Sequence, residues 1–306
     1  MRLLPLFLLL SASLSAAPAV IEGTWKNQAS GRVISYRARV PETPGKRPTV
    51  LISHGLGGSK DAMEYLGKHW AANGYLVVHI QHPGSDSSIF AGMLLDRERA
   101  LKAATSVEEF TARVQDAKVA LDKLRLTPGL AERHDAGEVA IAGHSYGART
   151  SMALSGERFP TAPGADFSDP RIRASIILSP PPVSGPERFA AIGIPQFHIT
   201  GTKDTTPIEE SKDPAMRLCP FRESTNPESY LVVLDGADHM AFSGRIPMMA
   251  GEAVRSNYTR WHALLADATL RFLDATLRAD KSAKAWLNGD GLPKLVGSAG
   301  KVERRK

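Results

Sequence analysis

The 306-residue chain contains a single cysteine, Cys219. One cysteine cannot form a disulfide within the chain, so the stability of the fold does not depend on such a bond. The nine histidines include no pair at the H-E-x-x-H spacing of a helical zinc site, so the sequence predicts no metal. Aromatic residues make up only 7% of the chain, and they are not interleaved with basic residues as in a groove for nucleic acid.

Most of the formal net charge of +6 lies at the carboxyl end. Residues 294–306 hold five basic side chains against Glu303, a net charge of +4. The remainder is close to neutral, which argues against a nucleic-acid partner. We expect residues 291–306 to form a short, flexible basic tail, with attraction to anionic surfaces as a secondary role.

The longest apolar run is confined to the amino end. Arg2 precedes an apolar stretch at 3–14, and Ser15-Ala-Ala17 supplies small residues for cleavage. The stretch is too short to span a membrane as a stable helix. The pattern predicts a signal peptide at residues 1–17 and export to the periplasm or the extracellular space, without a stable membrane span after cleavage. An uncleaved anchor is the alternative.

Segments typical of strands alternate with longer amphipathic segments. We expect strands near 49–53, 75–80, 138–142, 173–178, 196–200 and 230–234, and helices near 60–73, 107–126, 145–157 and 256–278. This alternation predicts an α/β fold with a mostly parallel, doubly wound sheet and helices on both faces. Residues 21–40 could add antiparallel edge strands. Residues 18–290 suit one large domain, since neither a repeat nor a linker divides them.

The segment Glu138-Val-Ala-Ile-Ala-Gly-His-Ser-Tyr-Gly-Ala-Arg-Thr150 holds a G-x-S-x-G pattern between a strand-like run and a helix-like run. In such a turn the serine adopts a strained backbone conformation, and Gly143 and Gly147 let strand and helix approach closely. The hydroxyl then stands at the carboxyl end of the sheet, beside the N-terminus of a helix. Ser145 is therefore a candidate nucleophile.

A serine nucleophile needs a base, and the base needs a carboxylate, in the chain order Ser, Asp, His. Residues 195–204 resemble a strand that opens into a loop with Asp204, and residues 230–239 a strand followed by His239. We expect His239 to take the Ser145 proton during attack on a carbonyl and to return it to the leaving group. Asp204 would hold the imidazole tautomer and stabilise the imidazolium.

An oxyanion hole needs a further backbone N–H from the loop after an earlier strand. Residues 48–59 form an apolar run followed by a glycine-rich turn, His54-Gly-Leu-Gly-Gly. We expect the backbone N–H groups of Leu56 and Tyr146 to form the hole. His54 is expected to brace the loop without taking part in the chemistry.

Other residues compete for these roles. Asp204 could be a turn residue, and Asp235 and Asp238 are alternative acids, although Asp238 adjoins His239 and is expected to point away from it. Only His262 follows His239, within the expected terminal helix. The remaining histidines in strand, loop or surface positions are expected to be structural: His79, His82, His134 and His198.

The ordered motifs resemble those of the α/β-hydrolase superfamily: His54-Gly-Leu-Gly-Gly, Gly143-His-Ser-Tyr-Gly, Gly201-Thr-Lys-Asp and Ala237-Asp-His. More narrowly, residues 53–61 and 66–85 are similar to the dienelactone-hydrolase-like and platelet-activating-factor acetylhydrolase-like esterases. The likeness runs from about residue 45 to about residue 275. It implies the α/β-hydrolase fold and a carboxylic ester hydrolase with neither a metal nor an organic cofactor.

The chain departs from these families at two points. In the platelet-activating-factor branch the acid follows the strand after the nucleophile helix, but here that run, Ile176-Ile-Leu-Ser-Pro-Pro-Pro, has no carboxylate. Its absence favours Asp204, as in dienelactone hydrolases and polyester-degrading cutinases. Dienelactone hydrolases use a cysteine nucleophile, so Ser145 argues against dienelactone chemistry itself.

Two stretches, 83–106 and 240–258, could line an acyl or alcohol pocket or simply cover the edge of the sheet. Their candidate pocket residues are Phe90, Met93, Leu94, Met240 and Phe242. Neither stretch is long enough for a large cap domain, which favours small to medium, water-soluble esters over bulk lipid.

The sequence thus predicts an exported serine carboxylesterase that forms an acyl-enzyme on Ser145, with a small-molecule ester as its partner. One alternative is a serine peptidase or amidase of the same fold. Another is a non-catalytic hydrolase-fold protein that holds a ligand in the same pocket.

Overall fold

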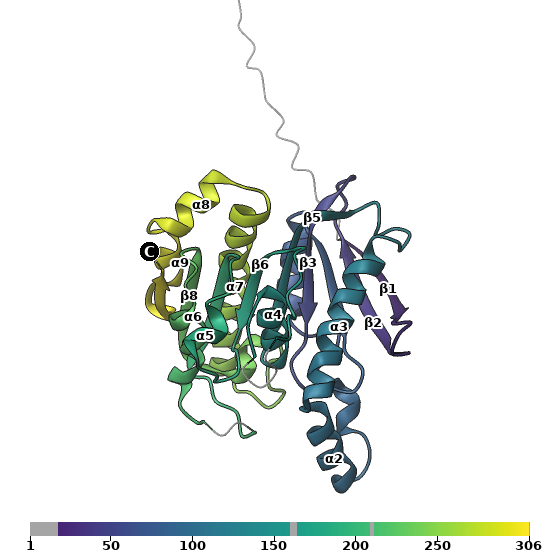
Figure 1. Ribbon diagram of the computed structural model, residues 1–306. Coiled ribbons are helices and arrows are strands. Elements are labelled where there is room, and N and C mark those ends of the chain that lie inside the picture. The colour runs from purple at the N-terminus through teal and green to yellow at the C-terminus, as the bar shows by residue number, and fades with distance from the viewer. Residues whose placement is uncertain (1–17, 160–163, 209–210, 306) are drawn as a thin grey trace, which may run out of the picture.

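The computed structural model describes residues 18–159, 164–208 and 211–305, so the expected signal peptide at residues 1–17 lies outside the described residues. Within them, nine strands form one sheet in the order β1-β2-β4-β3-β5-β6-β7-β8-β9 (Figure 1). The strands are β1 (Ala19–Lys26), β2 (Val33–Val40), β3 (Arg47–Ser53), β4 (Leu76–Gln81), β5 (His134–His144), β6 (Ile172–Leu178), β7 (Gln196–Lys203), β8 (Ser229–Asp238) and β9 (Gly300–Arg304).

The central strands from β4 through β3, β5, β6 and β7 to β8 are parallel. At one edge β2 joins β4 in antiparallel fashion, and β1 joins β2. The predicted α/β fold with a mostly parallel, doubly wound sheet is therefore confirmed. Because parallel strands all end on the same side, the loops after β3, β5, β7 and β8 meet at one edge of the sheet.

Helices pack on both faces of the sheet (Figure 1). They are α1 (Glu64–Ala72), α2 (Leu94–Ala104), α3 (Val107–Leu124), α4 (Tyr146–Ser155), α5 (Pro186–Phe189), α6 (Cys219–Glu223), α7 (Glu252–Leu277), α8 (Lys281–Asn288) and α9 (Gly291–Val296), with short 3₁₀ turns η1 (Ser87–Phe90), η2 (Pro214–Leu218), η3 (His239–Phe242) and η4 (Gly297–Ala299). Among the described residues, none of these helices has the length and apolarity that crossing a bilayer would require.

The strand alternation divides the core into two layers. Leu51 of β3 packs with Val114 of α3 on one face, whereas Val50 packs with Trp70 of α1 and Phe272 of α7 on the other. All five side chains are fully buried, and burial of each stabilises the fold by about 1.5–3 kcal/mol. The two layers hold the central strands, and therefore the loops at their carboxyl ends, in fixed positions.

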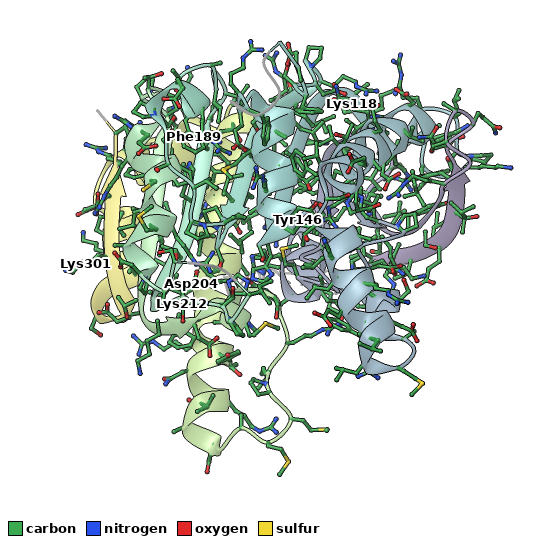
Figure 2. The ribbon with its side chains drawn as sticks, turned by 60° about the horizontal axis from the view of Figure 1, so that its bottom comes forward. Lys118, Tyr146, Phe189, Asp204, Lys212 and Lys301 are labelled. Atoms are coloured by element: carbon green, nitrogen blue, oxygen red, sulfur yellow. The ribbon has the colours of Figure 1, made fainter. Side chains whose placement is uncertain are left out.

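The carboxyl end differs from its prediction. Residues 291–305 are not a flexible tail: they form α9, η4 and β9, and β9 pairs with β8 in antiparallel register, Val302 opposite Val232. Leu292 and Val296 are buried in the core beside α7. Lys301 lies at the outer edge of the sheet (Figure 2). The prediction was wrong because it rested on the basic residues, whereas the apolar residues between them pack against elements distant in the sequence: Leu292 and Val296 beside α7, and Val302 opposite Val232 of β8.

Candidate active site

Ser145 occupies a tight turn between β5 and α4, with φ 57° and ψ −116°. Non-glycine residues rarely adopt such angles, and holding one there costs of order 1–3 kcal/mol. The turn depends on its glycines. A Cβ at Gly143 would lie 2.1 Å from the Gly147 carbonyl oxygen, and one at Gly147 would lie 2.0 Å from the Ser53 carbonyl oxygen. The close approach of β5, α4 and the end of β3 thus holds Ser145 in this turn, at the start of α4.

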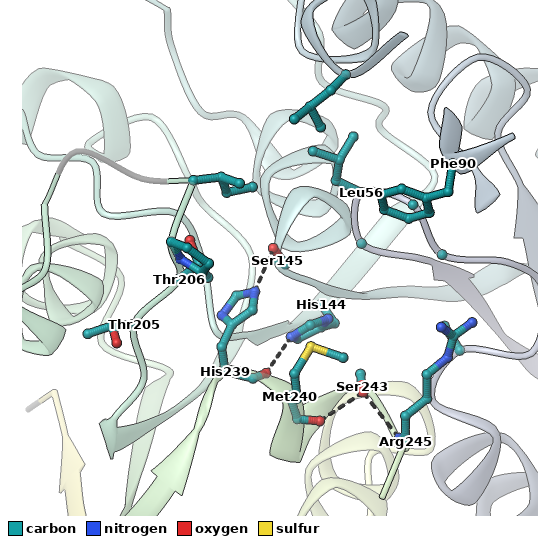
Figure 3. A pocket seen from close by; sticks show the side chains of 17 residues that line it. Leu56, Phe90, His144, Ser145, Thr205, Thr206, His239, Met240, Ser243 and Arg245 are labelled. Atoms are coloured by element: carbon teal, nitrogen blue, oxygen red, sulfur yellow. Dashed lines mark hydrogen bonds between the residues drawn. The ribbon is translucent and has the colours of Figure 1, made fainter. Parts of the chain in front are cut away.

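The structure brings the three predicted residues Ser145, His239 and Asp204 together. His239 lies where β8 passes into η3, and its Nε2 is 2.9 Å from Ser145 Oγ (Figure 3). On the other side of the ring, Nδ1 is 2.9 Å from Asp204 Oδ1. The distances suit proton transfer from the hydroxyl to the imidazole, with the carboxylate fixing the tautomer.

Asp204 is buried, 1% exposed, and other groups besides His239 bind its carboxylate. The Thr200 hydroxyl donates to Oδ2 at 2.8 Å, and the Arg217 guanidinium lies 2.8 Å from Oδ1. Burial alone would raise the pKa of Asp204. The hydrogen bond from His239 and the Arg217 cation outweigh burial and hold that pKa below its ordinary value. The carboxylate is therefore charged at neutral pH and able to orient His239.

Ser179, which sequence reasoning missed, completes this arrangement. It follows β6, and its Oγ lies 2.8 Å from Asp204 Oδ1 and 2.6 Å from His239 Nδ1. The hydroxyl can donate to the carboxylate while its oxygen faces the imidazole N–H. The residue has φ 50°, a second strained position beside Ser145. A polar residue directly after β6, in the run that lacks a carboxylate, was the available signal.

The rival acid Asp238 points away from the imidazole, as predicted. Its Oδ1 accepts the Ala241 N–H at 3.0 Å and the Tyr258 hydroxyl at 2.7 Å, so it caps η3. His262, the one histidine that follows His239, donates from Nε2 to the Ala241 carbonyl at 2.8 Å. The four histidines expected to be structural lie outside the residues that line the cavity over Ser145: His79, His82, His134 and His198.

The loop after β3 lies against the serine turn, where the oxyanion hole is expected. Gly57 has φ +69°, and its N–H donates to the Ser85 carbonyl at 2.9 Å. Leu56 and Ser145 line the same cavity, and the N–H of Tyr146, the first residue of α4, has no acceptor within its own helix. His54 braces the loop: its Nδ1 lies 2.6 Å from the Gly55 carbonyl oxygen.

A cavity of about 300 Å³ opens over Ser145 and His239 (Figure 3). Of the predicted pocket residues, Phe90 and Met240 line it. The predictions for Met93, Leu94 and Phe242 were wrong. Met93 and Leu94 are 80% and 79% exposed at the start of α2, which projects from the body of the molecule (Figure 1). Phe242 is the last residue of η3, and its side chain is fully buried in the core. Sequence reasoning missed several other lining residues, among them Leu101, Pro207, Ile208 and Arg245.

A model of the family described as serine aminopeptidase, S33, matches residues 44–217, more than half of the chain. The chain belongs to this family. The S33 assignment confirms the predicted α/β-hydrolase superfamily, while the narrower dienelactone-hydrolase and acetylhydrolase likeness stays a prediction. A search of the curated proteins finds no match.

Among solved structures, the S33 chain is similar to a ferulic acid esterase from Streptomyces cinnamoneus, with a TM-score of 0.63 and 18% sequence identity. The alignment covers 95% of this chain and 99% of that one. At this identity the likeness shows a common fold over nearly the whole length.

Proposed function

We propose that this protein is a serine carboxylesterase. The observation that carries the proposal is the continuous chain of contacts from Ser145 Oγ through His239 to Asp204 beneath a mainly apolar cavity. In the first step His239 Nε2 removes the Ser145 proton as Oγ attacks the ester carbonyl. The proton then passes to the alcohol that leaves, and an acyl-enzyme remains. A water molecule, activated by the same imidazole, releases the acid.

The described lining of the cavity supports an ester substrate. Its residues are mainly apolar or small, with Arg245 the one lysine or arginine among them. No Asp or Glu of the described lining is placed to pair with the free ammonium group of an aminopeptidase substrate, so esters are the proposed substrates and peptides are the alternative to be tested. The volume of about 300 Å³ lies at the lower end for small-molecule sites. We therefore infer that the substrates are esters with short to medium acyl groups.

We further propose that the enzyme acts outside the cytoplasm. The support is the composition of residues 1–17, with a positive start, an apolar centre and small residues at the end. Expression of the full chain, followed by fractionation and mass determination of the mature amino terminus, tests this location independently of activity.

The activity is tested with p-nitrophenyl esters from acetate to palmitate, using the wild-type protein, Ser145→Ala and the control Ser155→Ala. Ser155 lies at the far end of the same helix, where its hydroxyl donates to the Ser151 carbonyl. We expect hydrolysis of the shorter esters, loss of at least about 10³-fold in Ser145→Ala, and an unchanged rate in Ser155→Ala. A fluorophosphonate probe should label the wild type at Ser145 only.

Two outcomes would favour the alternatives. Cleavage of aminoacyl p-nitroanilides faster than of the esters would make the protein a peptidase. Equal background rates in the wild type and Ser145→Ala, together with saturable binding of an ester, would make it a ligand-binding protein.

A further inference from the structure

Among the described residues, Arg113 is a fully buried charged side chain that takes no part in the triad. It lies on the inner face of α3, one turn after Phe110, and is 0% exposed. Among the described residues it forms no ion pair, because the nearby carboxylates of Glu109 and Asp116 bind Arg32 instead. A buried cation without a direct ion pair costs several kcal/mol. The charges of Glu109 and Asp116 act favourably on Arg113 but are outweighed by its burial, so its retention calls for a compensating role.

The guanidinium of Arg113 binds only neutral groups, and these belong to the segments around the expected oxyanion hole. Nη2 donates to the carbonyl oxygen of His54 and, at 3.1 Å, to Ser53 Oγ, both at the end of β3. Nη1 donates to Ser85 Oγ at 2.9 Å. Nε faces Thr150 Oγ1 of α4 at 3.3 Å. One side chain thus joins three segments that the chain order keeps apart.

Two contacts of Arg113 bear on the expected hole. The His54 carbonyl is two residues before Leu56, so a hydrogen bond to it orients the turn that presents the Leu56 N–H. The Tyr146 ring stacks on the guanidinium, with the Arg113 Cζ atom 4.5 Å from the ring centre. Tyr146, which carries the other N–H, is the first residue of α4 and is labelled in Figure 2. Arg113 therefore contacts the segments that carry both expected donors.

The charge of Arg113 also persists under working conditions. Burial lowers the pKa of Arg113 to about 10, which leaves the guanidinium protonated at neutral pH. Burial and then the Arg113 cation lower the pKa of His54 well below its ordinary value, so this neighbour is neutral. The guanidinium is thus a positive charge in contact with the segments that carry the expected donors, in a region of low dielectric where charges interact strongly.

We propose that Arg113 is a positioning residue of the oxyanion hole: its guanidinium ties the loop after β3 to the start of α4, sets the spacing of the Leu56 and Tyr146 N–H groups, and stabilises the negative oxygen as it forms. This inference rests on the proposed esterase function. It predicts that Arg113 acts on the transition state more than on the bound substrate, because the oxygen gains its charge only during attack.

The test compares Arg113→Met with Arg149→Met, using p-nitrophenyl butyrate and a trifluoromethyl ketone. The ketone forms a tetrahedral adduct with an active serine and places its oxygen in the hole. Arg149 is a matched control because its guanidinium also packs on an aromatic ring near Tyr146, 5.3 Å from the centre of Phe110, and the described contacts do not link it to the loop after β3. Concentrations of active enzyme come from burst titration.

We expect Arg113→Met to lower kcat about 10–100-fold, to change KM less than about threefold, and to weaken ketone binding by the same factor as kcat. Arg149→Met should keep all three within about twofold. Arg113→Lys keeps the charge without the planar fork and should recover part of kcat. If Arg113→Met does not fold, Arg113→Lys carries the test, with a several-fold loss of kcat and of ketone affinity expected.

An Arg113→Met enzyme with wild-type kcat and ketone affinity per active site would overturn the proposal and leave Arg113 a structural residue. Wild-type values in Arg113→Lys would overturn it equally, since positioning requires the fork. These failures differ from failure of the esterase proposal, in which the wild type itself neither hydrolyses the esters nor binds the ketone.

Discussion

The candidate site has two halves: an acid–base half around Asp204 and His239, and an oxyanion half formed by the loop after β3 and the start of α4. Each half has a buried arginine beside it, but the two arginines lie in different electrostatic settings. On the acid–base half, Arg217 is 1% exposed and lies 2.8 Å from Asp204 Oδ1, a buried ion pair. On the oxyanion half, Arg113 is equally buried but binds hydroxyls, a carbonyl oxygen and a ring. The same residue type at the same burial therefore neutralises a permanent charge in one half. In the other half, on the proposal above, it stabilises a charge that forms only during the reaction.

This contrast separates stability from activity. Removing one partner of a buried ion pair leaves the other charge without compensation, so the free energy of unfolding falls strongly. Removing a buried cation that forms no direct ion pair also removes a desolvation cost, so the free energy of unfolding falls less. Variants in the two halves should therefore differ in what they lose.

The largest effect is expected from Asp204→Asn on the acid–base half. The amide cannot hold the same imidazole tautomer, so kcat should fall about 10³–10⁴-fold. The matched control is Asp238→Asn, one residue from His239 but directed toward Ala241 and Tyr258. Ester hydrolysis at saturating substrate measures both. A comparable loss in the two variants would show that Asp204 has no special role.

Arg217→Met should destabilise the protein by about 3–5 kcal/mol, because Asp204 is left buried without its cation. Arg113→Met should cost clearly less stability while losing more kcat per active site. Urea unfolding of both variants at pH 7, followed by fluorescence, measures the difference. Equal losses of unfolding free energy would break the comparison drawn between the two halves.

Acid should destabilise the folded protein through its buried histidines. Burial lowers the pKa of His144 to about 3 and that of His198 to about 3. Below about pH 6.5 the unfolded chain protonates these rings while the folded chain does not. The unfolded state then binds more protons, so stability falls as the pH falls from about 6.5 toward 3.

A substitution at one buried histidine isolates this effect. His198 contacts Phe221 away from the catalytic atoms, so His198→Phe should reduce the slope of unfolding free energy against pH. The reduction should approach about 1.4 kcal/mol per pH unit near pH 5 and be roughly half of that between pH 6 and 7. Urea midpoints at pH 5, 6 and 7 measure the slope. Parallel wild-type and variant curves would show that His198 is not neutral in the folded state.

The smallest effect is expected at Ser179. Loss of its hydroxyl in Ser179→Ala removes one donor to Asp204, worth about 1–3 kcal/mol, and kcat should fall several-fold. Ser179→Gly removes the same donor but suits φ 50° better than alanine. The glycine variant should therefore match the alanine variant in kcat and exceed it in melting temperature. Identical melting temperatures would argue against strain at this position.

The sequence predicted the parts of the molecule that are set by local pattern. The central strands follow from apolar runs, and the positions of Ser145, Asp204 and His239 follow from strand ends in a parallel sheet. Ser179 and Arg217 were missed because their contacts to Asp204 span the chain between separate elements. Arg113 could have been noticed, because it is an arginine at a position where the helical spacing of α3 predicts a buried apolar residue. The spacing alone does not say what such an arginine binds.

The pocket was the least predictable part. Leu101 comes from α2, and Pro207 and Ile208 come from the loop after β7, so their convergence depends on how these two segments pack over the sheet. Met93 and Leu94 were expected there because of their apolar character, but α2 turns them toward solvent. Side-chain type identifies what could line a cavity, whereas the loop path decides which residues do.

Strand β9 also has a consequence for handling the protein. It covers the hydrogen-bonding edge of β8 and presents Lys301, Glu303 and Arg304 to solvent. Charged edge strands discourage other sheets from pairing. A chain shortened before Gly300 would expose the backbone of β8 between apolar residues, a template for self-association. The final residues thus act as a solubility element of the fold, and a purification tag is better attached beyond them than put in their place.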